Sequence, residues 1–84
     1  MMFLSVAYPQ TQGLVLNSDN LPVSNVNVYF ADENILIYTN KDGVFSVEQE
    51  IPNNSYIHFF KHGYASRLIK YKKDEGLRIM LEKL

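Results

Sequence analysis

Residues 25–47, NVNVYFADENILIYTNKDGVFSV, contain three apolar runs separated by two polar turns. In the first run Val26, Val28 and Phe30 alternate with polar or aromatic neighbours. Because successive side chains of a strand point to opposite faces, this spacing puts the three apolar residues on one face. The turns, ADEN and NKDG, consist largely of residues that favour backbone bends. The segment therefore predicts strands with one buried and one solvated face, as in antiparallel sheets.

Short apolar runs and turn clusters alternate along the rest of the chain as well. The runs are rich in β-branched and aromatic residues, and they predict strands at residues 12–16, 25–30, 35–39, 44–47, 56–61, 65–71 and 77–81. No segment keeps a helical period for three turns, so helix is limited to a single turn at residues 48–51 or 72–75. We predict an all-β fold, a small Greek-key β-sandwich of about seven antiparallel strands.

The alternation within these strands also predicts a core. The residues expected to be largely buried are Val26, Val28, Phe45, Val47, Ile57, Phe59, Ile69, Ile79 and Leu81. In the run RLIKY, Arg67, Ile69 and Tyr71 share one face, and Leu68 and Lys70 share the other.

Residues 38–45, YTNKDGVF, are predicted to form a tight hairpin between two neighbouring strands. Gly43 can adopt the left-handed conformation that such a turn requires. Asp42 and Asn40 can accept hydrogen bonds from backbone N–H groups in the bend. A calcium loop is not expected, because Ca²⁺ takes about six oxygen ligands and mostly apolar residues follow Gly43.

The chain has 84 residues, enough for one small domain, and no cysteine. Its net charge of −1 hides an asymmetry. Residues 1–60 carry one lysine against six carboxylates (net −5), and residues 61–84 carry seven cations against three carboxylates (net +4). A basic face for nucleic acid or anionic lipid is one interpretation. We favour two halves that neutralise each other and expect no nucleic-acid partner, because a nucleic-acid-binding domain usually has a basic total.

The apolar segments of the chain are short. No run reaches the roughly 18 apolar residues of a membrane span, so we predict no transmembrane span. Residues 1–10, MMFLSVAYPQ, end their apolar part in a small-x-small pattern like a signal-peptidase site, but lack a positive region. These residues are interpreted either as the remnant of an export signal or as a short first strand.

The side chains needed for catalysis or metal binding do not form a recognisable set. His58 and His62 are the only histidines, and they lie on or beside a predicted strand with no nearby acid. A zinc site needs three or four converging ligands. None of the six serines lies in a nucleophile elbow. We predict no catalytic residue, no cofactor and no metal.

The order of these features resembles the carboxypeptidase regulatory-like domain, a small prealbumin-type β-sandwich. The family's elements are matched here by TQGLVLNSDNLPVSNVNVYF, YTNKDGVFSV, YIHFFKHGY and LRIMLEKL, which together run from about residue 11 to residue 84. One departure is that Leu21 precedes Pro22, where the family usually has proline before leucine. Residues 11–84 are thus predicted to be a single domain of this type.

The residues that match the family pattern are structural. They are Gly13, Pro22, Asp42, Gly43, Phe45, Gly63 and Tyr64. We expect Gly13 to permit close approach or a bend in the first strand, and Pro22 to stiffen the entry to the second strand. Gly63 should turn the chain between the fifth and sixth strands, and Tyr64 should pack its ring inward.

The resemblance implies a non-catalytic accessory domain of an exported bacterial protein. Such domains follow the catalytic domain of metallocarboxypeptidases or precede the plug of TonB-dependent outer-membrane receptors, and the signal-like start of this chain fits the receptor arrangement better. The implied location is periplasmic, outer-membrane-associated or extracellular. The implied partner is another protein or an adjacent domain.

A carbohydrate-binding or surface-adhesion module is the alternative function. In that case exposed tyrosine rings would serve as stacking platforms, and the candidates are Tyr29, Tyr38, Tyr56 and Tyr71. A cluster of these rings on one exposed face would favour the alternative, and scattered rings would favour the accessory domain.

Overall fold

The computed structural model describes residues 11–84, which form seven strands and one 3₁₀ turn. These are β1 (Thr11–Leu16), β2 (Asn27–Phe30), β3 (Ile35–Tyr38), β4 (Val44–Val47), β5 (Tyr56–Phe60), β6 (Arg67–Lys70), η1 (Lys73–Glu75) and β7 (Arg78–Met80). The predicted all-β sandwich is confirmed. Both interpretations of residues 1–10 lie outside the described residues.

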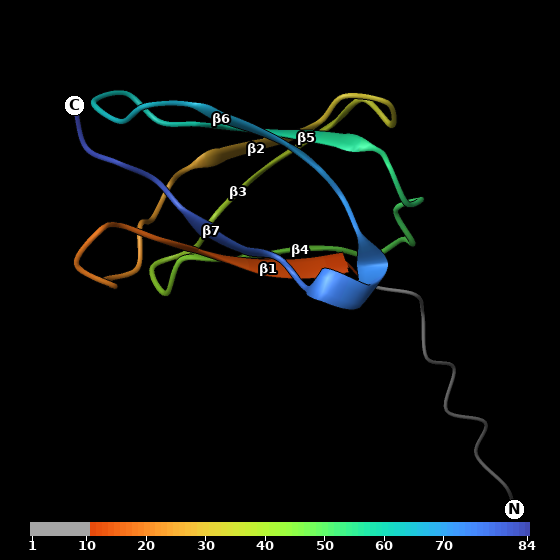
Figure 1. The fold of residues 1–84 in the computed structure, drawn as a ribbon, viewed down its shortest axis with the longest axis horizontal. Helices are drawn as coiled ribbons and strands as arrows, with labels where there is room; N and C mark the ends of the chain where they lie inside the picture. The colour runs from red at the N-terminus through yellow and green to blue at the C-terminus, as the bar shows by residue number, and fades with distance from the viewer. Residues whose placement is uncertain (1–10) are drawn as a thin grey trace, which may run out of the picture.

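The strands form two stacked layers (Figure 1). One is a three-stranded sheet in the order β4-β1-β7, and the other is a four-stranded sheet in the order β3-β2-β5-β6. Within the four-stranded sheet all neighbours are antiparallel. The chain crosses between the layers after β1, β3, β4 and β6, so each sheet is assembled from separate stretches of sequence.

One strand pair departs from the antiparallel prediction. β1 and β7 run parallel, with Leu14 opposite Arg78 and Leu16 opposite Met80. Parallel neighbours need a crossover connection instead of a hairpin. β7 has one, because the chain builds the whole four-stranded sheet between β1 and β7. Local turns fix the relative direction of consecutive strands only, so this pairing left no mark in the sequence pattern.

The core lies between the two sheets. Eight of the nine predicted core residues are buried, and Ile69 is half-buried. The ring of Phe45 lies 6.4 Å from that of Phe30 and 5.6 Å from that of Phe59, so aromatic contacts join the layers. Further core members, beyond the predicted set, are Val15, Val23, Phe30, Ile51, Tyr71 and Leu77.

Residues 38–45 turn a corner between the sheets instead of forming a hairpin. β3 lies in the four-stranded sheet and β4 in the three-stranded sheet, so the predicted pairing of these strands is wrong. The bend itself is tight, because Gly43 N donates to Asn40 O and Asn40 N donates to Val44 O, each at 2.9 Å. Turn residues decide that the chain bends. The partner of β4 is decided by β1, whose Val15 N donates to Gly43 O at 2.8 Å.

The corner depends on Gly43 and Asn40. Gly43 has a φ of +74°, and a Cβ there would lie 2.5 Å from Val15 O. Asn40 Oδ1 accepts hydrogen bonds from Asp42 N at 2.9 Å and from Val44 N at 3.0 Å. The side-chain role expected of both Asp42 and Asn40 therefore belongs to Asn40, and Asp42 takes part through its backbone N–H.

Gly13 and Pro22 contact the core and the first strand. A Cβ on Gly13 would lie 2.2 Å from Cζ of Phe45, so this glycine leaves room for the buried phenylalanine ring. Pro22 forms an isolated bridge with Leu16 and does not lead into β2, which begins at Asn27. The expected entry role is not seen because the chain at Pro22 first pairs with the end of β1.

Gly63 and Tyr64 lie between β5 and β6. Gly63 has a φ of +89°, and Tyr64 N donates to Lys61 O at 3.0 Å across the turn. Tyr64 is half-buried against the core and forms a bridge with Lys83. This bridge draws the β5–β6 turn to the chain segment that follows β7.

Within residues 11–84, helix is confined to η1, in one of the two places where the sequence allows a single turn. Among residues 11–84 no helix is long and apolar enough to cross a membrane. The acidic and basic halves of the chain meet at an ion pair between Glu50 and Lys73. This is the one ion pair formed within the described residues, so the opposite charges of the halves are mostly not paired directly.

Candidate interaction surface

The side of the four-stranded sheet that faces away from the core carries unusual residues for a solvated surface. Strand register places Leu36, Tyr29, His58 and Leu68 in one row across β3, β2, β5 and β6. This row runs from one edge of the sheet to the other. Two of its four members, at the two edges, are leucines.

Two further rows complete this surface. Tyr38, Asn27 and Phe60 form the row on one side, and Tyr56 and Lys70 form the row on the other. We call the whole set the outer face. It consists of Asn27, Tyr29, Leu36, Tyr38, Tyr56, His58, Phe60, Leu68 and Lys70.

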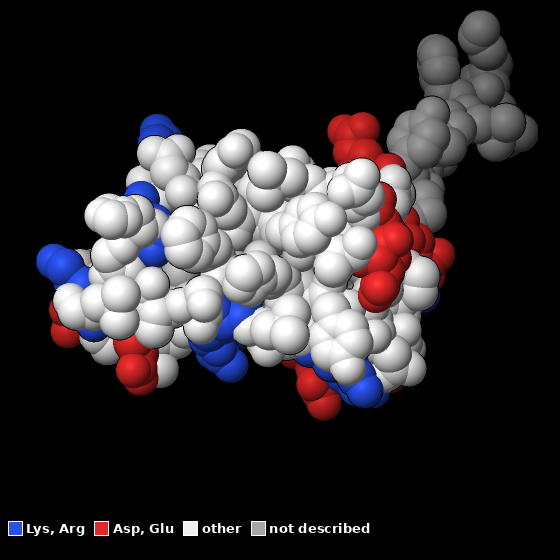
Figure 2. All heavy atoms as spheres, turned by 90° about the horizontal axis from the view of Figure 1, so that it is seen from above, with Lys and Arg blue, Asp and Glu red and all other residues white. Residues whose placement is uncertain are grey.

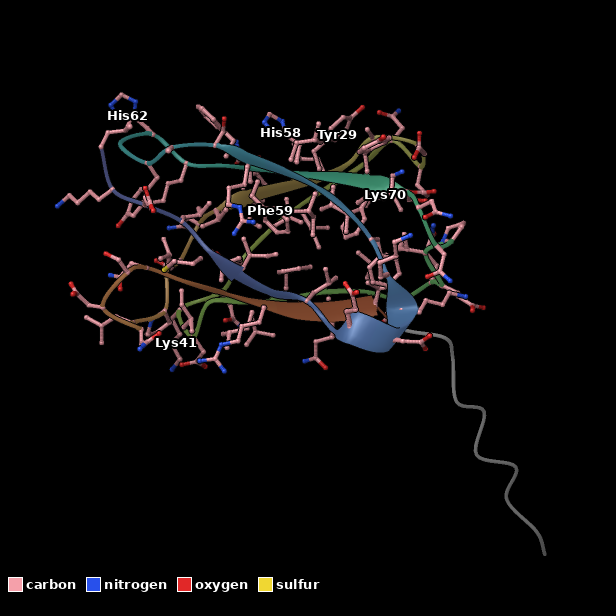
Figure 3. All side chains as sticks on the ribbon, viewed as in Figure 1. Tyr29, Lys41, His58, Phe59, His62 and Lys70 are labelled. Atoms are coloured by element: carbon pink, nitrogen blue, oxygen red, sulfur yellow. The ribbon has the colours of Figure 1, made fainter. Side chains whose placement is uncertain are left out.

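These side chains point outward because their neighbours are needed in the core. On β5, Ile57 and Phe59 are fully buried, and the period of two then turns Tyr56, His58 and Phe60 to the opposite side. Figure 3 shows Phe59 between the sheets, and His58 on the side away from the three-stranded sheet. A register slip would expose the core, so the orientation of the outer face is fixed by folding itself.

The apolar side chains of the outer face are largely exposed. The exposed fractions are 63% for Leu68, 58% for Tyr38, 51% for Leu36, 46% for Phe60 and 44% for Tyr56. These are five of the eight exposed large hydrophobic residues among residues 11–84. Scattered exposed apolar residues are ordinary, whereas a contiguous patch of them marks an interaction site.

Charge is confined to the rim of the outer face. Figure 2 shows a broad uncharged centre, with carboxylates gathered toward one end. At the Tyr56 end, Asp32 Oδ2 accepts a hydrogen bond from Tyr56 N at 3.2 Å, and Lys70 Nζ lies 5.7 Å from the centroid of the Tyr56 ring. On this side of the sheet β6 carries one cation, Lys70, because Arg67 points to the opposite side, whereas β3 carries none.

Three of the four tyrosines considered as stacking platforms lie on the outer face. Tyr38 and Tyr56 are exposed, and Tyr29 is half-buried with its hydroxyl donating to Asn34 Oδ1 at 3.0 Å. Tyr71 is 9% exposed and belongs to the core, so its assignment as a platform is wrong. The three remaining rings are therefore clustered, not scattered.

The leucines and Phe60 were not identified as site residues from sequence. The sequence does contain a signal, because each of them lies an even number of positions from an outward-facing residue of its own strand. Leu36 is paired in this way with Tyr38, Leu68 with Lys70, and Phe60 with Tyr56. What the pattern lacks is strand order. Without it, residues from four strands cannot be assigned to one surface.

The remaining candidate chemistry does not converge. His58 is on the outer face, His62 is in the exposed β5–β6 turn, and Figure 3 shows the two apart. Among residues 11–84 no three histidine, cysteine or acidic side chains are grouped as metal ligands would be. A hollow of about 270 Å³ lies between β6 and β7, lined by Ala65, Arg67, Met80 and Glu82. Arg67 there donates to the backbone oxygen of Met80 at 3.3 Å and so serves the structure.

Comparison with known proteins shows the fold and no family. No family model matches the chain, and no curated protein matches it. Among solved structures, the chain is similar to 3-chlorocatechol 1,2-dioxygenase from Rhodococcus opacus 1CP, with a TM-score of 0.64 and 12% sequence identity. The match covers 95% of this chain and 61% of that chain, so the β-sandwich corresponds to part of the larger protein. At this identity the likeness concerns the fold alone.

Proposed function

We propose that the chain is a non-catalytic interaction domain that binds a partner protein or an adjacent domain through the outer face. One observation carries the proposal: five large apolar side chains are exposed together on one side of the four-stranded sheet. Interface centres are enriched in aromatic residues and poor in charge, with a polar rim. The outer face has this composition, with Asp32 and Lys70 at its rim.

The proposal is restricted to binding because catalysis needs groups that meet around a reacting atom. Within residues 11–84, the histidines are apart and no metal-ligand cluster is present. Leu36, Phe60 and Leu68, which are exposed on the outer face, have no proton to transfer and no nucleophilic atom. Their contribution to a partner is apolar surface.

We further propose that the domain is an accessory part of an exported bacterial protein, in the periplasm, at the outer membrane or outside the cell. The ordered match to the carboxypeptidase regulatory-like pattern supports this. The sequence of the gene on both sides of this chain tests it. A receptor plug and barrel or a peptidase domain downstream is the expected result. A cytoplasmic enzyme in the same reading frame would contradict it.

The interaction surface can be tested in that longer protein by hydroxyl-radical footprinting. Side chains of the outer face, such as Leu36, Phe60 and Leu68, should react more slowly than in the isolated chain. Met80 is 44% exposed on the other sheet and provides the internal control, since its rate should stay the same. Equal rates at every outer-face residue would contradict the proposal.

Carbohydrate binding is the second candidate, and the clustering of Tyr29, Tyr38 and Tyr56 on one face favours it. Aromatic rings offer flat apolar platforms with a polar edge. Asn27 and His58 lie among the rings and offer hydrogen-bonding groups. The exposed leucines are the feature that this function does not use, since they have no polar group and no ring.

A matched pair of variants separates the two candidates. If sugars bind, calorimetry with soluble cello- or chito-oligosaccharides should give a saturating isotherm that Tyr38→Ala abolishes and Leu68→Ala leaves unchanged. If the outer face binds protein, no such isotherm is expected, and the Leu68 change should weaken partner binding at least as much as the Tyr38 change. A sugar isotherm insensitive to Tyr38→Ala would rule out stacking on this face.

A further inference from the structure

We infer that the partner of the outer face is a second copy of this chain, bound face to face about a two-fold axis parallel to the strands. This inference rests on the proposed interaction function and specifies its partner. Three features of the outer face support it: the order of residues within a row, the placement of charge at the rim, and the apolar area.

The central row of the outer face is complementary to itself. Its order is Leu36, Tyr29, His58 and Leu68, from the β3 edge to the β6 edge. A two-fold axis parallel to the strands exchanges the two edges of the sheet and keeps each row in place. Leu36 of one copy then meets Leu68 of the other, and this contact occurs twice, as in any isologous interface. Two facing sheets with aligned strands are a common packing arrangement.

The charges at the rim of the outer face favour a two-fold axis parallel to the strands over a two-fold axis that runs across the strands. On the outer face the β6 edge is basic through Lys70, whereas the β3 edge has no charge and is preceded by the acidic Asp32 and Glu33 in the β2–β3 turn. Exchanging the edges brings Lys70 of each copy toward the acidic turn of the other. An axis across the strands would instead place β6 on β6 and leave Lys70 far from the acidic turn of the other copy. Opposite charges across an interface fix its register, and like charges oppose it.

The apolar area fits a weak dimer. The five exposed side chains amount to a patch on the order of 500 Å², at the upper end of what monomeric proteins expose. A standard interface buries about 800 Å² on each partner. The patch therefore supplies the centre of such an interface, and Asn27, Tyr29, His58 and Lys70 must supply the rest. We expect dissociation constants in the micromolar range.

Sedimentation equilibrium of the chain from micromolar to millimolar concentration tests this inference. The average mass should rise with concentration toward twice the monomer mass. Leu68→Asp should raise the dissociation constant at least tenfold. Leu21→Asp is the matched control, because Leu21 is 58% exposed in the loop after β1, and its substitution should leave the constant unchanged. Equal effects of the two changes would overturn the inference.

The orientation is tested by exchanging charge. Lys70→Glu and Asp32→Lys should each weaken the dimer several-fold, and the double variant should recover most of the loss, because the pair is restored with its signs reversed. Losses that simply add would overturn the proposed axis. Circular dichroism shows for each variant that the sandwich is retained.

The failure of this inference can be distinguished from failure of the proposed function. If the folded chain stays monomeric at millimolar concentration, the second copy is excluded as the partner. Footprinting of the longer protein then decides the function, since a protected outer face would retain the interaction domain and an unprotected one would not. Saturable binding of an oligosaccharide by a monomeric chain would also overturn the inference and identify the sugar as the occupant.

Discussion

The two sheets of the sandwich differ in what they present to solvent. The three-stranded sheet exposes mostly polar residues, Gln12, Ser46 and Arg78, with Met80 as its one exposed large apolar side chain among residues 11–84. The four-stranded sheet exposes Leu36 and Leu68 at its edges, with aromatic rings between them. Both sheets bury their inner faces in the same core. Burial of the core therefore does not account for the difference between the two outer surfaces.

This difference shows where a small sandwich leaves room for function. Inner positions are constrained by packing, because a core has near-crystalline density and tolerates little change in volume. Outer positions are free of that constraint and could all be polar without loss of the fold. On the four-stranded sheet five of them are instead large exposed apolar side chains, a composition that lowers solubility and agrees with the proposed interaction surface.

The sharpest test of the comparison uses adjacent residues of β5 that lie on opposite sides of the sheet. Phe59 has no exposed surface, and Phe60 is 46% exposed. Phe59→Ala should lower the free energy of unfolding by about 3–5 kcal/mol, from lost burial plus the cavity left behind. Phe60→Ala should lower it by less than about 1 kcal/mol. Urea melts of both variants measure this, and similar losses would mean that the outer face is a second core.

The corner between the sheets should be the next most sensitive place. At Gly43 the backbone has a φ of +74°, and a Cβ would lie 2.5 Å from Val15 O. Gly43→Ala should cost about 1–2 kcal/mol of unfolding free energy, and Gly43→Val should cost more, because a β-branched residue fits that conformation worst. Lys41→Ala in the same turn needs no special φ and should cost under about 0.5 kcal/mol. If Gly43→Val melts like Lys41→Ala, the corner is not built in this way.

A loss of similar size is expected at Thr39, a buried polar residue that leads into the corner. Its hydroxyl donates to Val23 O at 2.7 Å and accepts from Val26 N at 3.0 Å. Thr39→Val keeps the shape but leaves both backbone groups without this partner, which should cost about 1–3 kcal/mol. Thr39→Ser keeps the hydroxyl and should therefore be more stable than Thr39→Val. Thermal melts of the two variants measure this difference. The opposite ranking would show that the methyl group matters more than the two hydrogen bonds.

The smallest effect on stability is expected on the outer face itself. Leu68→Thr replaces the most exposed apolar side chain of the outer face by a strand-compatible polar one. It should change the unfolding free energy of the monomer by less than about 0.5 kcal/mol while raising solubility. Chemical denaturation at low protein concentration measures the unfolding free energy of the monomer, and a precipitation assay measures the solubility. A clear loss of stability in dilute solution would show that Leu68 stabilises the fold. The exposed apolar residues of the four-stranded sheet would then no longer be independent of folding.

Much of the fold follows from the alternation of residues along the chain. The burial of Val26, Val28, Ile57 and Phe59 is correctly predicted, because parity in a strand is a local property. The same parity placed Tyr71 with Ile69 on the inner side. Its assignment as an exposed platform went against a pattern that was already visible in RLIKY.

The errors concern choices that local sequence does not encode. The bend at Gly43 was recognised, but its use as a corner depends on β1, which lies far away in the sequence. The parallel pairing of Leu14 with Arg78 likewise joins the two ends of the described chain. The outer face was missed for the same reason, since Leu36 and Leu68 share a row only once β2 and β5 lie between them.

The parallel pairing of β1 with β7 also has a consequence for the order of folding. Both hairpins of the four-stranded sheet, β2–β3 and β5–β6, join strands that follow one another in the chain. β1, in contrast, takes one of its two partners from the last strand. Contacts so distant in sequence require a large loop to close and form late. Pulse-labelled hydrogen exchange during refolding should therefore protect β5 before β7. During synthesis, one edge of β1 stays unpaired until β7 has left the ribosome.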